Sequence, residues 1–135
     1  MTSTAVRRLT TAGRILLGLP LIVNGLNGFL HLLPEPAPSL PDGAMAFVGA
    51  LASSGYMLPL IAGTHLVVGI LLLTNRFVPL ALALLAPFLV NSVAFHAFLE
   101  RSGLPVALMF TAVEVGLVIQ YRRAFLPMLA ARAIV

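Results

Sequence analysis

Two side chains that can exchange protons, His65 and Glu114, stand inside stretches of otherwise apolar sequence. Membrane proteins relay protons through His and Glu, and a carboxyl group near the middle of a bilayer is a functional candidate by default. Asn24 and Asn91 lie in two further apolar stretches. If each stretch is a helix that rises about 1.5 Å per residue, all four side chains reach a similar depth, roughly 14 Å from the outer surface. The spacing therefore predicts a polar layer that four helices share inside the bundle.

A second polar layer is expected nearer the outer surface. Asn24, Asn27 and His31 are spaced i, i+3 and i+7 near the end of the first stretch, so they share one helix face. His96 holds the corresponding place in the third stretch, and Ser92 precedes it by one turn on the same face. These side chains could hydrogen-bond the headgroup of a ligand that enters from the outer half of the bilayer.

The two outer histidines also raise the question of a haem or a metal. A bis-histidine haem needs His31 and His96 to oppose each other across open space. Three phenylalanine rings crowd the same region: Phe29, Phe95 and Phe98. A zinc site needs further ligands, for which only Glu35 or Asp42 is at hand. The sequence therefore argues against haem b and assigns no metal ligands, and two interfacial histidines without a partner remain an alternative.

Each polar group also has a structural interpretation. The asparagines, taken singly, are most simply interhelical hydrogen-bonding groups, worth about 0.6 kcal/mol per bond. Glu114 can form a structural pair with His65, or be a protonated acid that donates one hydrogen bond. Gly25 and Gly28, beside the asparagines, would let a neighbouring helix or a flat ligand approach closely.

The elements that would position these groups follow from the composition. The chain has 135 residues, of which 60% are hydrophobic and 9% charged, and its mean hydropathy is +1.07. This is too little charge to cover a soluble domain. Four stretches are long enough to cross a membrane as helices: 14–33, 56–75, 77–99 and 103–121. None of them alternates apolar and polar residues as a strand of a membrane barrel does. We predict one all-α membrane domain, a bundle of four transmembrane helices. The lack of cysteine excludes disulfides and thiol chemistry in this chain.

The arginines predict the orientation. Seven of the eight precede the first helix or stand at its start, lie between the second and third, or follow the fourth. Arg101 lies on the other side, with Glu35, Asp42 and Glu100. The positive-inside rule then places both termini in the cytoplasm of a bacterial inner membrane. In the outer loop, residues 34–55, the segment GAMAFVGALASSG is too short to span and predicts a short interfacial helix. No basic cluster with exposed aromatic residues indicates a nucleic-acid partner.

Several segments resemble the DoxX family of small bacterial membrane proteins: GLNGFLH, the GY..P pattern at Gly55 and Tyr56, GILLLTNRFVPLALALLAPF and NSVAFHAFLE. The resemblance runs from about Arg14 to Phe125. It implies a four-helix bundle in the cytoplasmic membrane. Some relatives are small subunits of a thiosulfate:quinone oxidoreductase, and others are linked to oxidant defence. The family offers no agreed catalytic residues. The second-helix position that often holds Glu in such sequences is His65 here, and Glu114 could replace that carboxylate.

Two functions follow as hypotheses. In the first, the bundle binds a quinone headgroup, and Glu114 and His65 relay protons. The residues expected to line that pocket are His31, His96, Asn27, Asn24, Asn91 and Ser92. An electron donor would have to come from a partner subunit, because the chain carries no flavin, iron–sulfur or thiol motif. In the second, the chain is a non-catalytic accessory subunit of a larger membrane complex, and its polar layers fix the packing of its helices.

Overall fold

The computed structural model describes residues 3–33 and 40–131. The described residues form helices and their connections, with no strand among them. The elements in chain order are α1 (Ser3–Leu30), α2 (Asp42–Ser53), α3 (Met57–Leu73), α4 (Val78–Phe98), the 3₁₀ helix η1 (Arg101–Gly103), α5 (Leu104–Gln120), α6 (Arg122–Phe125) and the 3₁₀ helix η2 (Leu126–Leu129). Glu35, the proline-rich part of the outer loop and Arg132 lie outside the described residues.

Three helical segments are long and apolar enough to cross a membrane: α1, α4, and η1 together with α5. The fourth candidate is α3, whose 17 residues are at the lower end of the spanning range. It joins α2 through a bend of 87°. The all-α polytopic fold predicted from the sequence is therefore confirmed, with three or four candidate spans. The short helix predicted in the first outer loop is present as α2.

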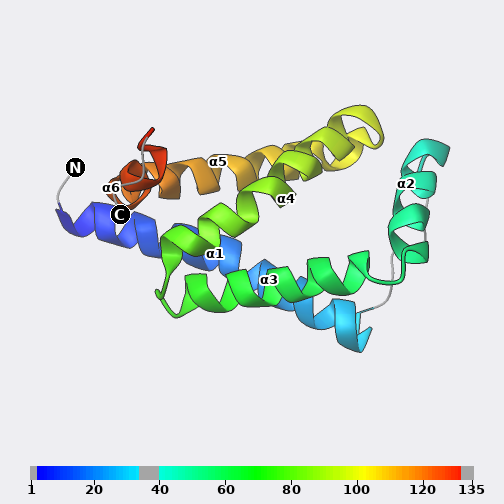
Figure 1. Ribbon diagram of the computed structural model, residues 1–135, viewed down its shortest axis with the longest axis horizontal. Helices are drawn as coiled ribbons and strands as arrows, with labels where there is room; N and C mark the ends of the chain where they lie inside the picture. The colour runs from blue at the N-terminus through cyan, green and yellow to red at the C-terminus, as the bar shows by residue number, and fades with distance from the viewer. Residues whose placement is uncertain (1–2, 34–39, 132–135) are drawn as a thin grey trace.

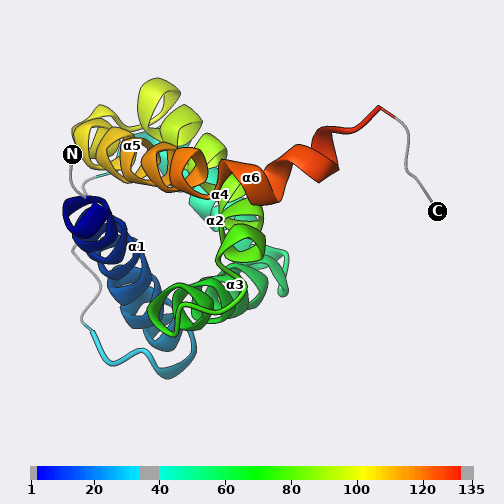
Figure 2. The ribbon, with the colours of Figure 1, turned by 90° about the vertical axis from the view of Figure 1, so that its left-hand side faces the viewer.

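The four long helices form a ring in the order α1, α3, α4, α5, seen end-on in Figure 2. The α1–α3 pair makes the most extensive contact. Gly25 allows this, because a Cβ there would lie 2.8 Å from the backbone oxygen of Ala62. Gly69 of α3 also allows the close approach, because a Cβ there would lie 2.9 Å from the backbone oxygen of Gly18. Of the two uses expected for glycine beside Asn24, the structure shows the close approach of a neighbouring helix.

The apolar core occupies one half of the bundle's length, the half nearer the turn between α3 and α4. Its largest fully buried side chains are Leu17, Leu72, Leu82, Leu85 and Val68. In α4, no residue beyond Leu89 is buried. The α1–α3 pair and the α4–α5 pair diverge toward the other end, where α2 lies across the opening (Figure 1). Phe47 of α2 reaches the ring of Phe95 in α4 at a centroid distance of 5.5 Å. The polar groups of the spans therefore lie at the border between a packed end and an open end.

Candidate functional site

His65 is the polar side chain around which the site is built. It lies in the middle of α3, is 7% exposed, and packs edge-on against Phe88 of α4 with a centroid distance of 4.4 Å. Its Nε2 is buried and has no hydrogen-bond partner in the described part of the chain. A buried polar atom without a partner costs free energy, so its presence calls for an explanation. A bound ligand would provide one.

One side of His65 faces a central cavity of about 80 Å³. The cavity is enclosed by all four long helices and is mostly apolar. Its lining residues are Leu17, Pro20, Leu21, Asn24, His65, Leu85, Phe88, Leu89 and Phe110. Asn24 is the second polar side chain in this wall, although part of its surface is exposed. The structure thus brings Asn24 and His65, two members of the predicted middle layer, to one cavity.

A groove between α3 and α4 also includes His65. Its volume is about 280 Å³, and it is lined by Met57, Leu60, Ile61, Thr64, His65, Leu84, Pro87, Phe88 and Asn91. Leu60 and Leu84 on its rim are exposed, as expected for side chains that face lipid. The groove and the central cavity share His65 and Phe88. His65 is therefore reachable from the outer surface of the bundle, past Asn91.

Glu114 is the other buried ionisable group. It is 5% exposed, and its Oε1 has no hydrogen-bond partner within residues 3–33 and 40–131. Phe110, which lines the central cavity, precedes it by one helical turn and shares its face of α5. No hydrogen bond or ion pair joins Glu114 to His65 in the described part of the chain. Both groups are thus buried near the cavity without being paired with each other.

The outer layer takes a different form from the predicted one. Asn27 Oδ1 accepts a hydrogen bond from the backbone N–H of Leu33 at 2.7 Å, and His31 lies at the end of α1 with φ = 50°. His31 is exposed. His31, Asn27 and Ser92 line neither the central cavity nor the groove. Asn27 has a local structural role here, since it satisfies a backbone donor just beyond the helix.

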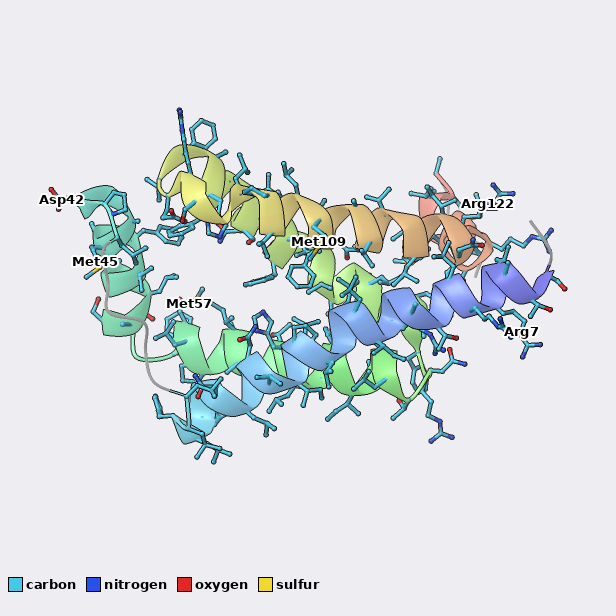
Figure 3. All side chains as sticks on the ribbon, turned by 180° about the vertical axis from the view of Figure 1, so that it is seen from behind. Arg7, Asp42, Met45, Met57, Met109 and Arg122 are labelled. Atoms are coloured by element: carbon cyan, nitrogen blue, oxygen red, sulfur yellow. The ribbon has the colours of Figure 1, made fainter. Side chains whose placement is uncertain are left out.

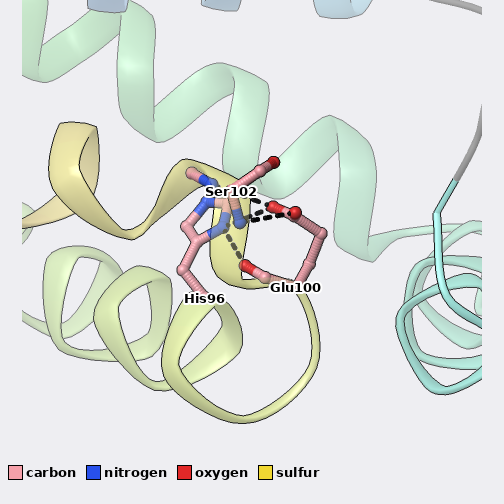
Figure 4. A network of polar contacts seen from close by, with 4 residues as sticks. His96, Glu100 and Ser102 are labelled. Carbon is pink, nitrogen blue, oxygen red and sulfur yellow. Dashed lines mark hydrogen bonds and ion pairs between the residues drawn. The ribbon is translucent and has the colours of Figure 1, made fainter.

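His96 belongs to a polar network at the turn between α4 and α5 (Figure 4). Its Nδ1 lies 3.0 Å from Glu100 Oε2 and 2.9 Å from the backbone oxygen of Glu100. Glu100 in turn accepts hydrogen bonds from the backbone N–H groups of Ser102 and Gly103, at 2.7 and 3.1 Å. Gly103 is required because a Cβ there would collide with the His96 ring. His96 therefore holds the start of η1 and α5, and no hydrogen bond links it to His31 in the part of the chain that the structure describes.

This network predicts a specific pH dependence. Hydrogen bonds from the Ser102 side chain and backbone, with those from Gly103 and His96, lower the pKa of Glu100 from 4.5 to about 2. A carboxylate whose pKa falls on folding adds stability above its unfolded pKa and loses it as pH falls through the folded pKa. We expect the melting temperature to drop between pH 4.5 and 2, and Glu100→Gln to remove part of that drop. Asp42→Asn, an equal charge change in α2, is the control. Identical pH profiles for wild type and Glu100→Gln would contradict this role.

The described residues contain no group of three or more His, Asp or Glu side chains that could hold a metal ion. The candidate site consists of two adjoining pockets, the central cavity and the groove, with the unpartnered imidazole of His65 between them. Sequence reasoning missed Phe88 and Phe110 as part of this site. An aromatic ring in an apolar helix carries no signal that separates a pocket wall from a lipid-facing side chain.

Comparison with known proteins gives a family but no individual relative. No curated protein and no solved structure matches the chain. A family model described as DoxX matches residues 9–97, more than half of the chain. The match includes His65, Phe88 and Asn91 but ends before α5 and Glu114. The four-helix arrangement, the apolar spans and this match together show that the chain belongs to the DoxX family of membrane proteins.

Proposed function

We propose that this DoxX protein binds the headgroup of a quinone in the groove between α3 and α4 and delivers protons to it. The observation that carries the proposal is His65, an imidazole that is buried yet unpartnered, and that lines both the groove and the central cavity. An N–H of His65 would donate to a quinone carbonyl oxygen, since an imidazole can donate from either ring nitrogen.

The two volumes favour the groove over the central cavity as the place of the quinone ring. A cavity of about 150 Å³ accommodates benzene. The central cavity, about 80 Å³, is smaller than that, whereas the groove offers about 280 Å³. The apolar tail of a quinone would remain in the bilayer beside Leu60 and Leu84. Asn91, at the same groove, supplies an amide that can hydrogen-bond a second oxygen of the ring.

Reduction of a quinone would give His65 and Glu114 different tasks. Reduction of a quinone to a quinol consumes protons together with electrons. His65 would pass a proton to the oxygen that it contacts, and Glu114 would resupply it from the far side of the central cavity. The electrons would come from a partner subunit that carries an electron-transfer cofactor, because this chain carries no flavin, iron–sulfur or thiol motif.

The distribution of charge supports an orientation in a bacterial inner membrane. Arg7 and Arg122 lie at one end of the molecule and Asp42 at the other (Figure 3). Arg76 lies in the α3–α4 turn, at the end shared with Arg7, because Asn75 and Arg7 line a common cavity. Under the positive-inside rule this end, with both termini, faces the cytoplasm.

Retention of quinone by the purified protein tests the proposal. We expect lipid extracts of the detergent-purified wild type to contain quinone in a fixed ratio to protein, measured by chromatography with ultraviolet detection. His65→Leu should weaken retention by about two- to tenfold, the effect of one hydrogen bond. Thr64→Phe should also reduce it, because the added ring would occupy the groove.

His31→Gln is the matched control, since His31 is an exposed histidine that lines neither pocket. It should retain quinone as the wild type does. Loss of quinone in His31→Gln with retention in His65→Leu would place the ligand in the outer layer and contradict the groove. Absence of quinone from the wild type, with stable copurification of a larger assembly, would instead favour an accessory subunit.

A further inference from the structure

A cavity of about 330 Å³ lies at the arginine-rich end of the bundle, where three parts of the chain meet. The N-terminal half of α1, the α3–α4 turn and the C-terminal end of α5 each supply side chains. We call it the arginine pocket, and its lining residues are Val6, Arg7, Thr10, Thr11, Arg14, Asn75, Gln120 and Tyr121. All of these except Val6 carry a polar side chain. A pocket with this lining lies well apart from the apolar groove at His65.

Arg14 is the central group of the arginine pocket. Its Nε and Nη1 are buried and have no hydrogen-bond partner in the part of the chain that the structure describes. Its Nη2 reaches only Thr11 Oγ1, at 3.4 Å. A guanidinium that is partly buried without a counter-charge is costly, because it has lost water and gained no anion. No Asp or Glu among the described residues lines the pocket. An anion from outside the described residues would supply the missing partner.

The other lining groups suit an anion with several oxygen atoms. Arg7 precedes Arg14 by seven residues, two helical turns, so both guanidinium groups lie on one face of α1. Asn75 and Gln120 bring amide N–H donors from two other elements. Tyr121 donates to Asn75 Oδ1 at 3.5 Å, which links the turn to the end of α5. Donors from three parts of the chain thus line one pocket, which suits a phosphate group because its oxygen atoms accept several hydrogen bonds.

The depth of the arginine pocket indicates where that phosphate would lie. Arg14 immediately precedes the apolar part of α1, Asn75 lies in the turn between two spans, and Tyr121 follows the last residue of α5. These positions correspond to the level of lipid headgroups, where tyrosine and arginine side chains are enriched. We propose that the arginine pocket binds a phosphate group at this level, in an anionic phospholipid or as the free anion. Basic pockets between helices on the cytoplasmic side bind acidic headgroups in the same manner.

Ligand-dependent stabilisation of the detergent-solubilised protein tests this site. We expect phosphatidylglycerol to raise the melting temperature of the wild type, and phosphatidylcholine, which has no net charge, to raise it much less. In Arg14→Gln the half-saturating concentration of phosphatidylglycerol should rise about tenfold, as expected for loss of a charge-assisted hydrogen bond. Arg7→Gln should act in the same direction and, because Arg7 is exposed, without disturbing the fold.

Arg101→Gln is the control, because it removes an equal charge at the opposite end of the chain's spans. Inorganic phosphate in place of lipid identifies the source of the phosphate: equal protection assigns the free anion, and protection by lipid alone assigns the headgroup. Either result supports the phosphate site if it depends on Arg7 and Arg14. The proposal is overturned if neither ligand stabilises the wild type. It is also overturned if Arg101→Gln weakens binding as much as the two pocket variants do.

Discussion

Replacing Gly25 of α1 with alanine should lower the free energy of unfolding by about 1–3 kcal/mol, the usual effect of overpacking. The new Cβ would lie 2.6 Å from Leu66 Cγ and 2.8 Å from the backbone oxygen of Ala62. A side chain can rotate away, but a backbone oxygen moves only if α3 shifts as a whole. Because α1 and α3 form the most extensive contact of the bundle, this shift would loosen the ring. Thermal unfolding followed by circular dichroism in detergent measures the effect.

Gly69→Ala tests the same contact from the other helix. Its Cβ would meet Ile22 Cγ1 at 2.8 Å and the backbone oxygen of Gly18 at 2.9 Å, so a similar loss is expected. Gly116→Ala in α5 is the control, because no atom of the described residues lies within 4 Å of the position of its Cβ. It should leave stability unchanged or raise it, since alanine favours helix more than glycine does. Equal effects of all three substitutions would show that helix propensity, not interhelical packing, sets the result.

The burial of His65 and Glu114 agrees with the expectation from the sequence, whereas the direction in which the two asparagines point does not. The sequence predicts His65 and Glu114 inside the bundle, and both are buried in the structure. Asn24 and Asn91 were expected in the same interior layer, yet both retain exposed surface, and Asn91 lines the α3–α4 groove. A helix that is apolar on all sides has no hydrophobic face to indicate its rotation. Only the packing of its neighbours decides which way such a residue points.

The outer layer shows a second limit of prediction from the sequence, which concerns the local hydrogen-bond partners of a side chain. His31 and His96 stand at similar places in their spans, which suggested a shared ligand, but their local partners were not visible from spacing. The partner of His96 is Glu100, which accepts the N–H groups that open η1. That capping arrangement depends on a turn of a few residues, where helix boundaries are hardest to predict. In the sequence, Arg14 indicates orientation and shares a helix face with Arg7, but only the structure shows that its Nε and Nη1 are buried without a partner among the described residues.

Replacing Glu114 with leucine should raise the free energy of unfolding by about 1–3 kcal/mol, the cost of a buried polar atom that lacks a partner. Leucine is close to glutamate in size and fits an apolar surrounding, so neither a cavity nor a clash is expected. Urea or thermal unfolding of the purified variant in detergent measures the change. Glu114→Gln, which keeps a polar group of the same shape, should show little of this gain. A large loss of stability in Glu114→Leu would show instead that the carboxylate belongs to a structural ion pair.

The same variant separates proton delivery from ligand binding. Glu114 lines neither the groove nor the central cavity, so Glu114→Leu should retain quinone as the wild type does, whereas His65→Leu should not. If Glu114 resupplies protons to His65 as proposed, proton-coupled reduction of quinone in native membranes should nevertheless fall in Glu114→Leu. A protein that gains stability and loses activity through one substitution has kept a destabilising group for its function. If activity in native membranes stayed at the wild-type level, Glu114 would have no part in proton delivery.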